Sequence, residues 1–145
     1  MKKDKKYLPV DIYTMFDISK STLFRWEKEA SFPPLERGDN GERQYNQTHV
    51  RWIGEKKVER LKRQYKFAIK AEDLERMEEI QTLLTKYKVL YLEDPTGLVE
   101  LEYHHYSDET IKKLLEKATD YETNSPAFRQ ILSAVYKQTV KDSDE

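Results

Sequence analysis

Apolar residues recur at helical spacing in two short segments near the beginning of the chain. The first segment has its apolar positions at Val10, Ile12, Met15 and Phe16, and Pro9 suits the first turn of a helix. After a turn at 17–19, Ser19 suits the N-cap of a second helix that runs to about Glu29. The pattern therefore predicts a helix, a three-residue turn and a second helix.

The second helix is expected to bury one side and to expose the other. Leu23 and Trp26 lie three positions apart, and we expect them to be buried together. The remaining side carries hydroxyls and cations, which can donate hydrogen bonds to phosphates and to guanine edges. These polar residues are Lys20, Ser21, Thr22, Arg25 and Lys28.

A proline-containing connector and a tight hairpin follow. The segment 32–35, Phe-Pro-Pro-Leu, is not helical, because proline lacks a backbone N–H and restricts the residue before it. Within 36–45, Asn40-Gly41 is a strong signal for a type I′ turn, which needs positive φ at both central residues. We therefore expect two short strands with their tip at 39–41, flanked by Arg37 and Arg43.

A long helical region is predicted from about Gln47 to Leu92, because it contains neither proline nor a cluster of turn residues. It is one bent helix or two helices. Within it, apolar residues alternate at spacings of three and four, which amounts to roughly two heptads of a coiled-coil seam. We expect this stripe to pair two copies of the chain, and its members are Leu74, Met77, Ile80, Leu84, Tyr87 and Tyr91.

The remainder of the chain is predicted to form a small helical unit. Turn residues at 93–97 break the preceding helix, and alternating apolar residues over 99–103 predict a short strand. Ser107 and Ser125 each suit the start of a helix. The aromatic side chains of this part could line a ligand pocket or form a core. We favour the core, because so short a segment is barely long enough to bury a core at all and needs its large side chains for it. They are Tyr103, Tyr106, Tyr121, Phe128 and Tyr136.

Together these patterns predict a mainly α chain. A basic tail (1–6) precedes a winged helix-turn-helix domain (7–66), in which the hairpin is the wing. A long dimerisation helix of the coiled-coil type (67–93), a small C-terminal helical unit (94–140) and a polar tail (141–145) follow.

Charge divides the chain in a way that its net value of −1 hides. Residues 1–66 contain 16 Lys and Arg against 10 Asp and Glu, whereas residues 67–145 contain 10 against 17, so the two parts carry +6 and −7. The positive part could meet a polyanion, which would repel the negative part.

Composition excludes several classes of function. The chain has no cysteine, so disulfides, thiolate metal sites and cysteine nucleophiles are impossible. No stretch approaches the ~18 apolar residues of a membrane span, and no apolar run follows the basic start, so we expect a cytoplasmic, nucleoid-associated protein. Adjacent His104 and His105 make a poor chelate. With no nucleophile, metal or phosphate-loop pattern, we expect neither an enzyme nor a cofactor.

The ordered motifs of the first part resemble the DNA-binding domain of the MerR family of regulators. The resemblance covers 7 to about 55. It rests on Ile-Ser-Lys-Ser-Thr-Leu-Phe-Arg-Trp-Glu at 18–27, on Phe-Pro-Pro at 32–34, and on Arg37, Asn40-Gly41, Arg43 and Tyr45. Family members share a hydroxyl-rich start to the recognition helix, a proline-containing connector and a wing of this pattern.

For the recognition helix, the resemblance implies that Ser21, Thr22 and Arg25 lie at the major groove or its flanking phosphates. Trp26 would match an aromatic residue that packs in the domain and also touches the DNA backbone.

For the wing, the resemblance implies that Arg37 and Arg43 lie near phosphate or the minor groove. Asn40 and Gly41 would form a tip small enough to approach the DNA backbone. Tyr45 would anchor the wing to the core or donate to a phosphate.

The resemblance also implies a dimer, in which two copies of the domain would read an inverted repeat in double-stranded DNA. Two departures accompany it. Members of the family usually follow the wing with two short helices joined by a glycine-containing turn, and 66–71 shows no such turn. The absence of cysteine excludes thiolate metal or redox sensing.

Two other functions stay open beside that of a regulator. An architectural protein of the excisionase kind shares a related winged fold and bends DNA. An adaptor would use the winged module and the coiled coil to bind another protein, although a protein partner does not require a basic module. Neither the target sequence nor an effector follows from the sequence.

Overall fold

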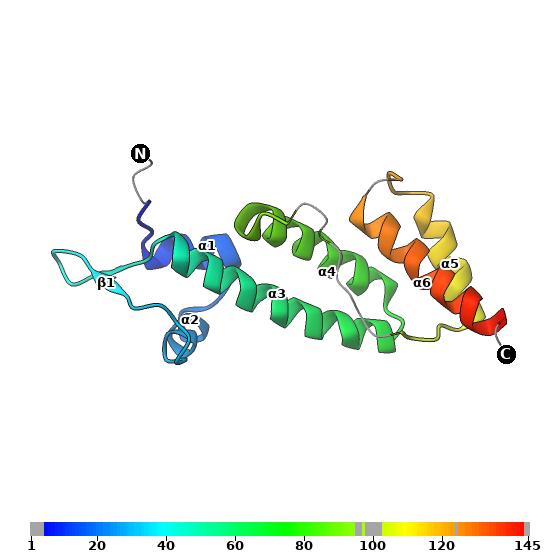
Figure 1. Cartoon of the computed structure of the whole chain (residues 1–145), viewed down its shortest axis with the longest axis horizontal. Helices are drawn as coiled ribbons and strands as arrows, with labels where there is room; N and C mark the ends of the chain where they lie inside the picture. Colours follow the sequence, from blue (N-terminus) through cyan, green and yellow to red (C-terminus); the bar gives the residue numbers. More distant parts are fainter. Residues whose placement is uncertain (1–4, 95–96, 98–102, 124, 144–145) are drawn as a thin grey trace. The chain divides into compact units, whose positions relative to one another are not determined.

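The computed structural model describes residues 5–94, 97, 103–123 and 125–143 (Figure 1). Over these residues the chain is mainly helical, as the sequence predicts. Its elements are α1 (Pro9–Phe16), α2 (Lys20–Glu27), β1 (Glu36–Arg37), β2 (Arg43–Gln44), α3 (Gln47–Lys70), α4 (Leu74–Tyr87), the π-helical segment η1 (Lys88–Leu92), α5 (Asp108–Ala118) and α6 (Pro126–Ser143). None of the described helices is long and apolar enough to cross a membrane.

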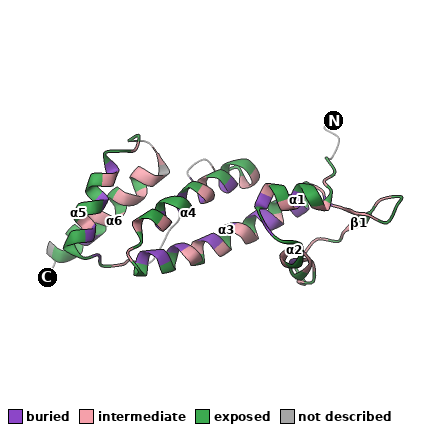
Figure 2. Cartoon of the chain, turned by 180° about the vertical axis from the view of Figure 1, so that it is seen from behind, coloured by how far each residue is buried: buried purple, intermediate pink, exposed green. Residues whose placement is uncertain are grey.

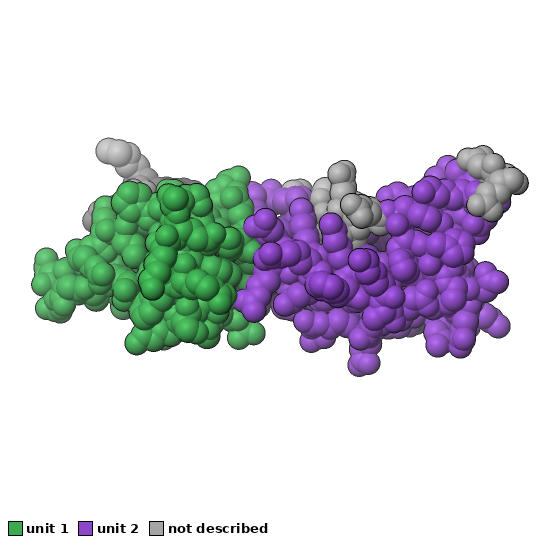
Figure 3. Space-filling view, turned by 90° about the horizontal axis from the view of Figure 1, so that it is seen from below, with its two compact units in different colours: residues 1–57 green, residues 58–145 purple. Residues whose placement is uncertain are grey.

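The contacts divide the chain into two compact units, residues 1–57 and residues 58–145 (Figure 3). The boundary falls inside α3, so that this helix contributes its first part to one unit and its second part to the other. Each unit has its own buried side chains (Figure 2).

In the first unit, α1 and α2 follow the predicted pattern. Pro9 begins α1, and Asp11 Oδ2 accepts a hydrogen bond of 2.8 Å from the backbone N–H just before that helix. Asp17 turns the chain with a φ of 50°. Ser19 Oγ then caps α2 by accepting the N–H of Thr22 at 3.2 Å. Helix α2 ends at Glu27, slightly before the predicted end.

β1 and β2 form the predicted antiparallel hairpin, but with a different turn. A type I′ turn is wrong here, because Gly41 has a φ of 79° whereas Asn40 is not among the described residues with positive φ. The N–H of Gly41 donates to the Gly38 carbonyl at 2.9 Å, and the N–H of Gly38 donates to the Glu42 carbonyl at 2.9 Å. These bonds match a three-residue loop in which a left-handed glycine follows a turn.

The core of the first unit draws on α1, α2, the first part of α3 and Tyr45 just after β2 (Figure 2). Tyr7 and Tyr45 exchange backbone hydrogen bonds of 2.8 and 2.9 Å, so the segment before α1 lies beside the end of the hairpin. Leu23 and Trp26 are both buried, which confirms the predicted inner side of α2. The other large buried side chains include Ile12, Phe16, Tyr45, Val50 and Ile53.

The long region after the hairpin consists of two helices, α3 and α4, rather than one. The chain breaks at 71–73, where Glu72 has a φ of 52° and Asp73 Oδ1 accepts the N–H of Arg76 at 3.1 Å. A single helix over 67–93 is therefore wrong, since its first residues are the end of α3. One left-handed residue followed by an N-cap aspartate ends one helix and starts the next without proline or glycine.

Most of the apolar stripe assigned to a dimer seam is buried inside the single chain. Met77 is 8% exposed, Tyr87 2%, and Ile80 and Leu84 0%. Leu74 and Tyr91 are half-buried. Because α4 packs on α6 within the second unit, the stripe forms the core of that unit. An amphipathic helix face has the same spacing whether a helix of the same chain or of another copy covers it.

Helices α5 and α6 pack on each other and complete the second unit. Ser107 caps α5, as predicted, by accepting a backbone N–H at 3.2 Å. Gln138, buried on α6, accepts the N–H of Tyr106 at 2.7 Å and donates to its carbonyl at 2.9 Å. Tyr106 belongs to the core as predicted, whereas Tyr136 is exposed. Most of the predicted strand at 99–103 lies outside the described residues.

Candidate nucleic-acid interface

The outer side of α2 gathers the polar side chains that the sequence analysis assigned to DNA. Lys20, Ser21, Arg25 and Lys28 are exposed, and Thr22 is half-buried. On the opposite side, Leu23 and Trp26 are held in the core. Because the inner side is fixed by packing, the outer side presents its cations and hydroxyls together.

Three hydroxyls meet at the beginning of α2. Ser19 Oγ lies 2.9 Å from Thr22 Oγ1 and 3.1 Å from Ser21 Oγ. The positive end of the helix dipole lies at the same place and favours an anion there. This arrangement suits a phosphate oxygen.

The tip of the hairpin is exposed, and Arg37 braces it. Asn40 and Gly41 lie at the surface, and Arg37 Nη1 donates to the Gly41 carbonyl at 3.1 Å. The side chain of Arg37 thereby stays beside the tip while remaining exposed.

The described end of the basic tail is bound to the hairpin. Lys6 Nζ lies 2.6 Å from Glu36 Oε2. The hydrogen bond and the charge of Lys6 hold the pKa of Glu36 below its usual value. The acid next to Arg37 is therefore paired with a cation of its own.

The guanidinium group of Arg43 contacts α2. Its guanidinium carbon lies 4.2 Å from the centre of the Phe24 ring. Its Nε lies 3.3 Å from Glu27 Oε2, outside hydrogen-bond geometry, so this contact is ionic. The Arg43 side chain is 30% exposed. We therefore assign Arg43 to the attachment of the hairpin to α2.

Tyr45 also turns inward and contacts the same carboxylate. Its side chain is completely buried, and its hydroxyl donates to Glu27 Oε1 at 2.5 Å. Burial and the neighbouring Glu27 both raise the pKa of Tyr45 far above its ordinary value. The hydroxyl is thus committed to Glu27, and we assign Tyr45 to the anchor of the hairpin.

Trp26 belongs to an aromatic cluster in the core. Its ring centre lies 6.4 Å from that of Trp52, which lies 4.9 Å from that of Phe32, both pairs edge to face. With 5% of its surface exposed, Trp26 offers little surface to DNA, so its role is packing.

His49 fixes the proline-containing connector. The buried ring accepts the N–H of Asn46 at Nδ1 at 3.0 Å. Its other nitrogen, Nε2, therefore carries the proton and donates to the carbonyls of Pro33 and Pro34, at 3.1 and 2.9 Å. These bonds hold the connector between α2 and the hairpin against the start of α3.

Glu27, Phe24 and His49 are structurally important residues that the sequence analysis did not single out. For Glu27 the sequence does offer a signal, because it is an acidic residue at the end of a helix that is expected to face DNA. Its side chain is 9% exposed. Nothing in the local sequence distinguishes His49 from a surface histidine, because its carbonyl partners lie more than a dozen residues earlier.

The described residues contain no group of three or more His, Asp or Glu side chains that could hold a metal ion. His104 Nε2 lies 4.0 Å from Glu72 Oε1, and His105 Nδ1 lies 3.8 Å from Asp142 Oδ1. The two histidines thus face different carboxylates.

Comparisons of the chain with protein-family models, with curated proteins and with solved structures return no significant match. The assignment of a function therefore rests on the geometry of this chain.

Proposed function

We propose that the chain is a sequence-specific DNA-binding transcriptional regulator of the MerR-like kind, with a winged helix-turn-helix in its first unit. The observation that carries the proposal is the outer side of α2, where Ser21, Arg25 and Lys28 are exposed opposite a buried Leu23. The major groove is about 12 Å wide and admits an α-helix. In a helix-turn-helix the second helix enters it.

The hairpin is the wing in this proposal. Arg37 beside the exposed tip would contact phosphate or the minor groove. Glu27 holds both Arg43 and Tyr45, so the wing and the recognition helix would meet DNA as one rigid surface. Such preorganisation lowers the entropy lost on binding.

A homodimer that reads an inverted repeat is the second part of the proposal. The stripe from Met77 to Tyr87 is buried within one chain, so the contact between two copies has to use other side chains. The mass of the protein in solution at micromolar concentration tests this part separately from DNA binding.

The test of DNA binding is selection from a pool of random duplexes, followed by titration of the enriched duplex at increasing salt. We expect an inverted repeat to be enriched, and log Kobs to fall with log salt by about 0.9 for each phosphate contact. Equal binding of every duplex would favour the architectural function, and no binding at low salt would favour the adaptor. Genome-wide occupancy of the tagged protein would then identify the regulated genes.

A further inference from the structure

The second half of α3 carries a cluster of cations in a unit that is otherwise acidic. Residues 58–70 contain five Lys and Arg against one Asp or Glu, whereas residues 71–145 contain 9 against 17. These two segments of the second unit therefore carry +4 and −8. The proposed contact of α2 and the hairpin with DNA does not use the cations of α3.

Four of these cations lie on one side of the helix. They follow each other at spacings of three, three and four residues, which keeps them within about a third of the helix circumference. We call them the α3 basic stripe, and its members are Arg60, Arg63, Lys66 and Lys70. Arg60 is half-buried and the other three are exposed.

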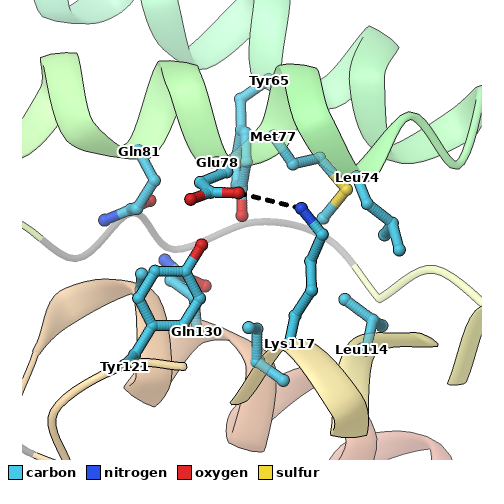
Figure 4. A pocket seen from close by; sticks show the side chains of 11 residues that line it. Tyr65, Leu74, Met77, Glu78, Gln81, Leu114, Lys117, Tyr121 and Gln130 are labelled. Atoms are coloured by element: carbon cyan, nitrogen blue, oxygen red, sulfur yellow. Dashed lines mark hydrogen bonds and ion pairs between the residues drawn. The ribbon is translucent and has the colours of Figure 1, made fainter. Parts of the chain in front are cut away.

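The other side of α3 is held in the core of the second unit. Leu61, Tyr65 and Ala68 are buried, and Tyr65 lines a narrow cavity together with Met77 of α4 (Figure 4). Because packing fixes this side of the helix, the α3 basic stripe faces away from the core of the second unit.

The charge of the stripe is not neutralised by neighbouring acids. None of its four side chains forms an ion pair within the part of the chain that the structure describes. Lys56, one turn earlier on the same helix, does form one, since its Nζ lies 2.6 Å from Glu29 Oε1. Glu59 is the one acidic residue of 58–70. The stripe therefore keeps a positive charge that a polyanion can bind.

The helix dipole accounts for only one of the four cations. A cation in the last turn of a helix is stabilised by the partial negative charge of that end, and Lys70 lies in the last turn of α3. This effect falls off within one turn. It therefore gives no reason for Arg60 and Arg63, which lie further from the end of the helix.

The length of the stripe suits the backbone of a duplex. An α-helix rises by about 1.5 Å per residue, so the stripe extends over about 15 Å. The major groove is about 12 Å wide, so long cationic side chains spread over this distance can reach several phosphates. Phosphate contacts position a protein on DNA and carry no sequence information by themselves.

We propose that the α3 basic stripe binds phosphates of double-stranded DNA and adds affinity that does not depend on the sequence of the duplex. The inference rests on the proposed DNA-binding function, because the duplex that the first unit binds is the polyanion that the stripe meets. It assigns to α3 a contact that is separate from those of α2 and the hairpin.

The test compares the full chain with a variant that lacks three cations of the stripe, Arg63→Gln/Lys66→Gln/Lys70→Gln. Fluorescence anisotropy measures the affinity for the selected duplex and for a random duplex of equal length, at salt concentrations from about 50 to 200 mM. The variant should bind both duplexes more weakly by the same factor. Its slope of log Kobs against log salt should be smaller by about 2.7, so that over this range its affinity falls about 40-fold less than that of the wild-type chain.

A matched control removes the same charge from α5 and α6. The variant Lys112→Gln/Arg129→Gln/Lys137→Gln changes three exposed cations and should keep the wild-type slope, and circular dichroism verifies the folding of both variants. An equal decrease of the slope in the control would overturn the inference, as would a loss of affinity confined to the selected duplex. A wild-type slope in the stripe variant would overturn it and leave the proposed function standing, whereas the absence of binding by the wild-type chain would overturn both.

Discussion

The Tyr45 hydroxyl donates a hydrogen bond of 2.5 Å to Glu27 Oε1, and this contact joins the end of the hairpin to the last residue of α2. The same carboxylate lies 3.3 Å from Arg43 Nε. One acidic side chain thus holds together the two elements that we propose to meet DNA. This role of Glu27 depends on the burial of its side chain, since an ion pair at the surface would do little to fix the hairpin against α2.

Tyr45→Phe tests this attachment. The substitution leaves the ring in place but removes the hydroxyl that donates to Glu27 Oε1. We expect the free energy of unfolding in urea to fall by about 1–3 kcal/mol, as for loss of a hydrogen bond to a buried charged group. Tyr136→Phe is the control, because this exposed tyrosine should change stability by less than about 0.5 kcal/mol. Equal stability of the two variants would contradict the role of Tyr45.

Arg25→Ala tests the recognition helix. Arg25 is exposed on the outer side of α2, so its loss should leave the melting temperature unchanged. Affinity for the selected duplex should fall by about 1–3 kcal/mol if the side chain contacts a base edge. Fluorescence anisotropy measures the affinity, and Arg129→Ala, an exposed arginine of α6 in the acidic part of the chain, is the control. Wild-type affinity in Arg25→Ala would remove this residue from the interface.

Leu84→Ala distinguishes a core residue from a residue of a dimer seam. Leu84 is completely buried within the single chain, so the substitution should lower the free energy of unfolding by about 2–5 kcal/mol. Urea unfolding measures this effect, and light scattering gives the mass at the same concentration. If Leu84→Ala instead halved the mass and kept the stability of the chain, the leucine would belong to a contact between two copies.

Gly97→Ala and Gly41→Ala separate steric overlap from backbone strain. Both glycines have positive φ, of 60° and 79°. A Cβ at Gly97 would lie 2.7 Å from Thr85 Oγ1 and 3.1 Å from Thr85 Cα, whereas one at Gly41 would meet no described atom within 4 Å. In both variants the left-handed conformation should lower the free energy of unfolding by about 1–2 kcal/mol. Gly97→Ala should lower it further, because its Cβ also overlaps Thr85. Thermal unfolding of the pair checks the order.

The contribution of Glu72 to the free energy of unfolding should depend on pH. Its carboxylate accepts hydrogen bonds from Thr110 Oγ1 at 2.6 Å and from Ser107 N and Oγ at 3.0 Å each. These bonds, of which that from Thr110 has the largest effect, hold the pKa of Glu72 below its ordinary value of 4.5. A carboxyl group with a lowered pKa in the folded state stabilises it above pH 4.5, and this contribution disappears as the pH falls through the folded-state pKa.

Glu72→Gln should therefore be less stable than the wild-type chain at pH 7, and the difference should shrink below pH 4.5. Urea unfolding across this range measures the change, with Glu75→Gln, exposed on α4, as the control. A difference that stayed constant with pH would show that the charge of Glu72 contributes nothing.

The sequence alone predicted the local starts and turns of the fold. Pro9 and Ser19 mark where α1 and α2 begin, and Ser107 marks α5. Such signals are readable because capping and proline preferences involve only a few neighbouring residues. The hairpin was predicted for the same reason. Its turn type was not, because the hydrogen-bond pattern of the whole loop decides which residues need positive φ.

Tertiary structure decided which polar and apolar residues are available at the surface. Arg25 and Arg43 are equally basic in the sequence, yet Arg25 is exposed while Arg43 lies between Phe24 and Glu27. The stripe through Leu84 likewise shows that a helix has an apolar side, but not which helix covers it. Periodicity determines the side of an element that will be buried, whereas the partner on that side is chosen by residues far away along the chain.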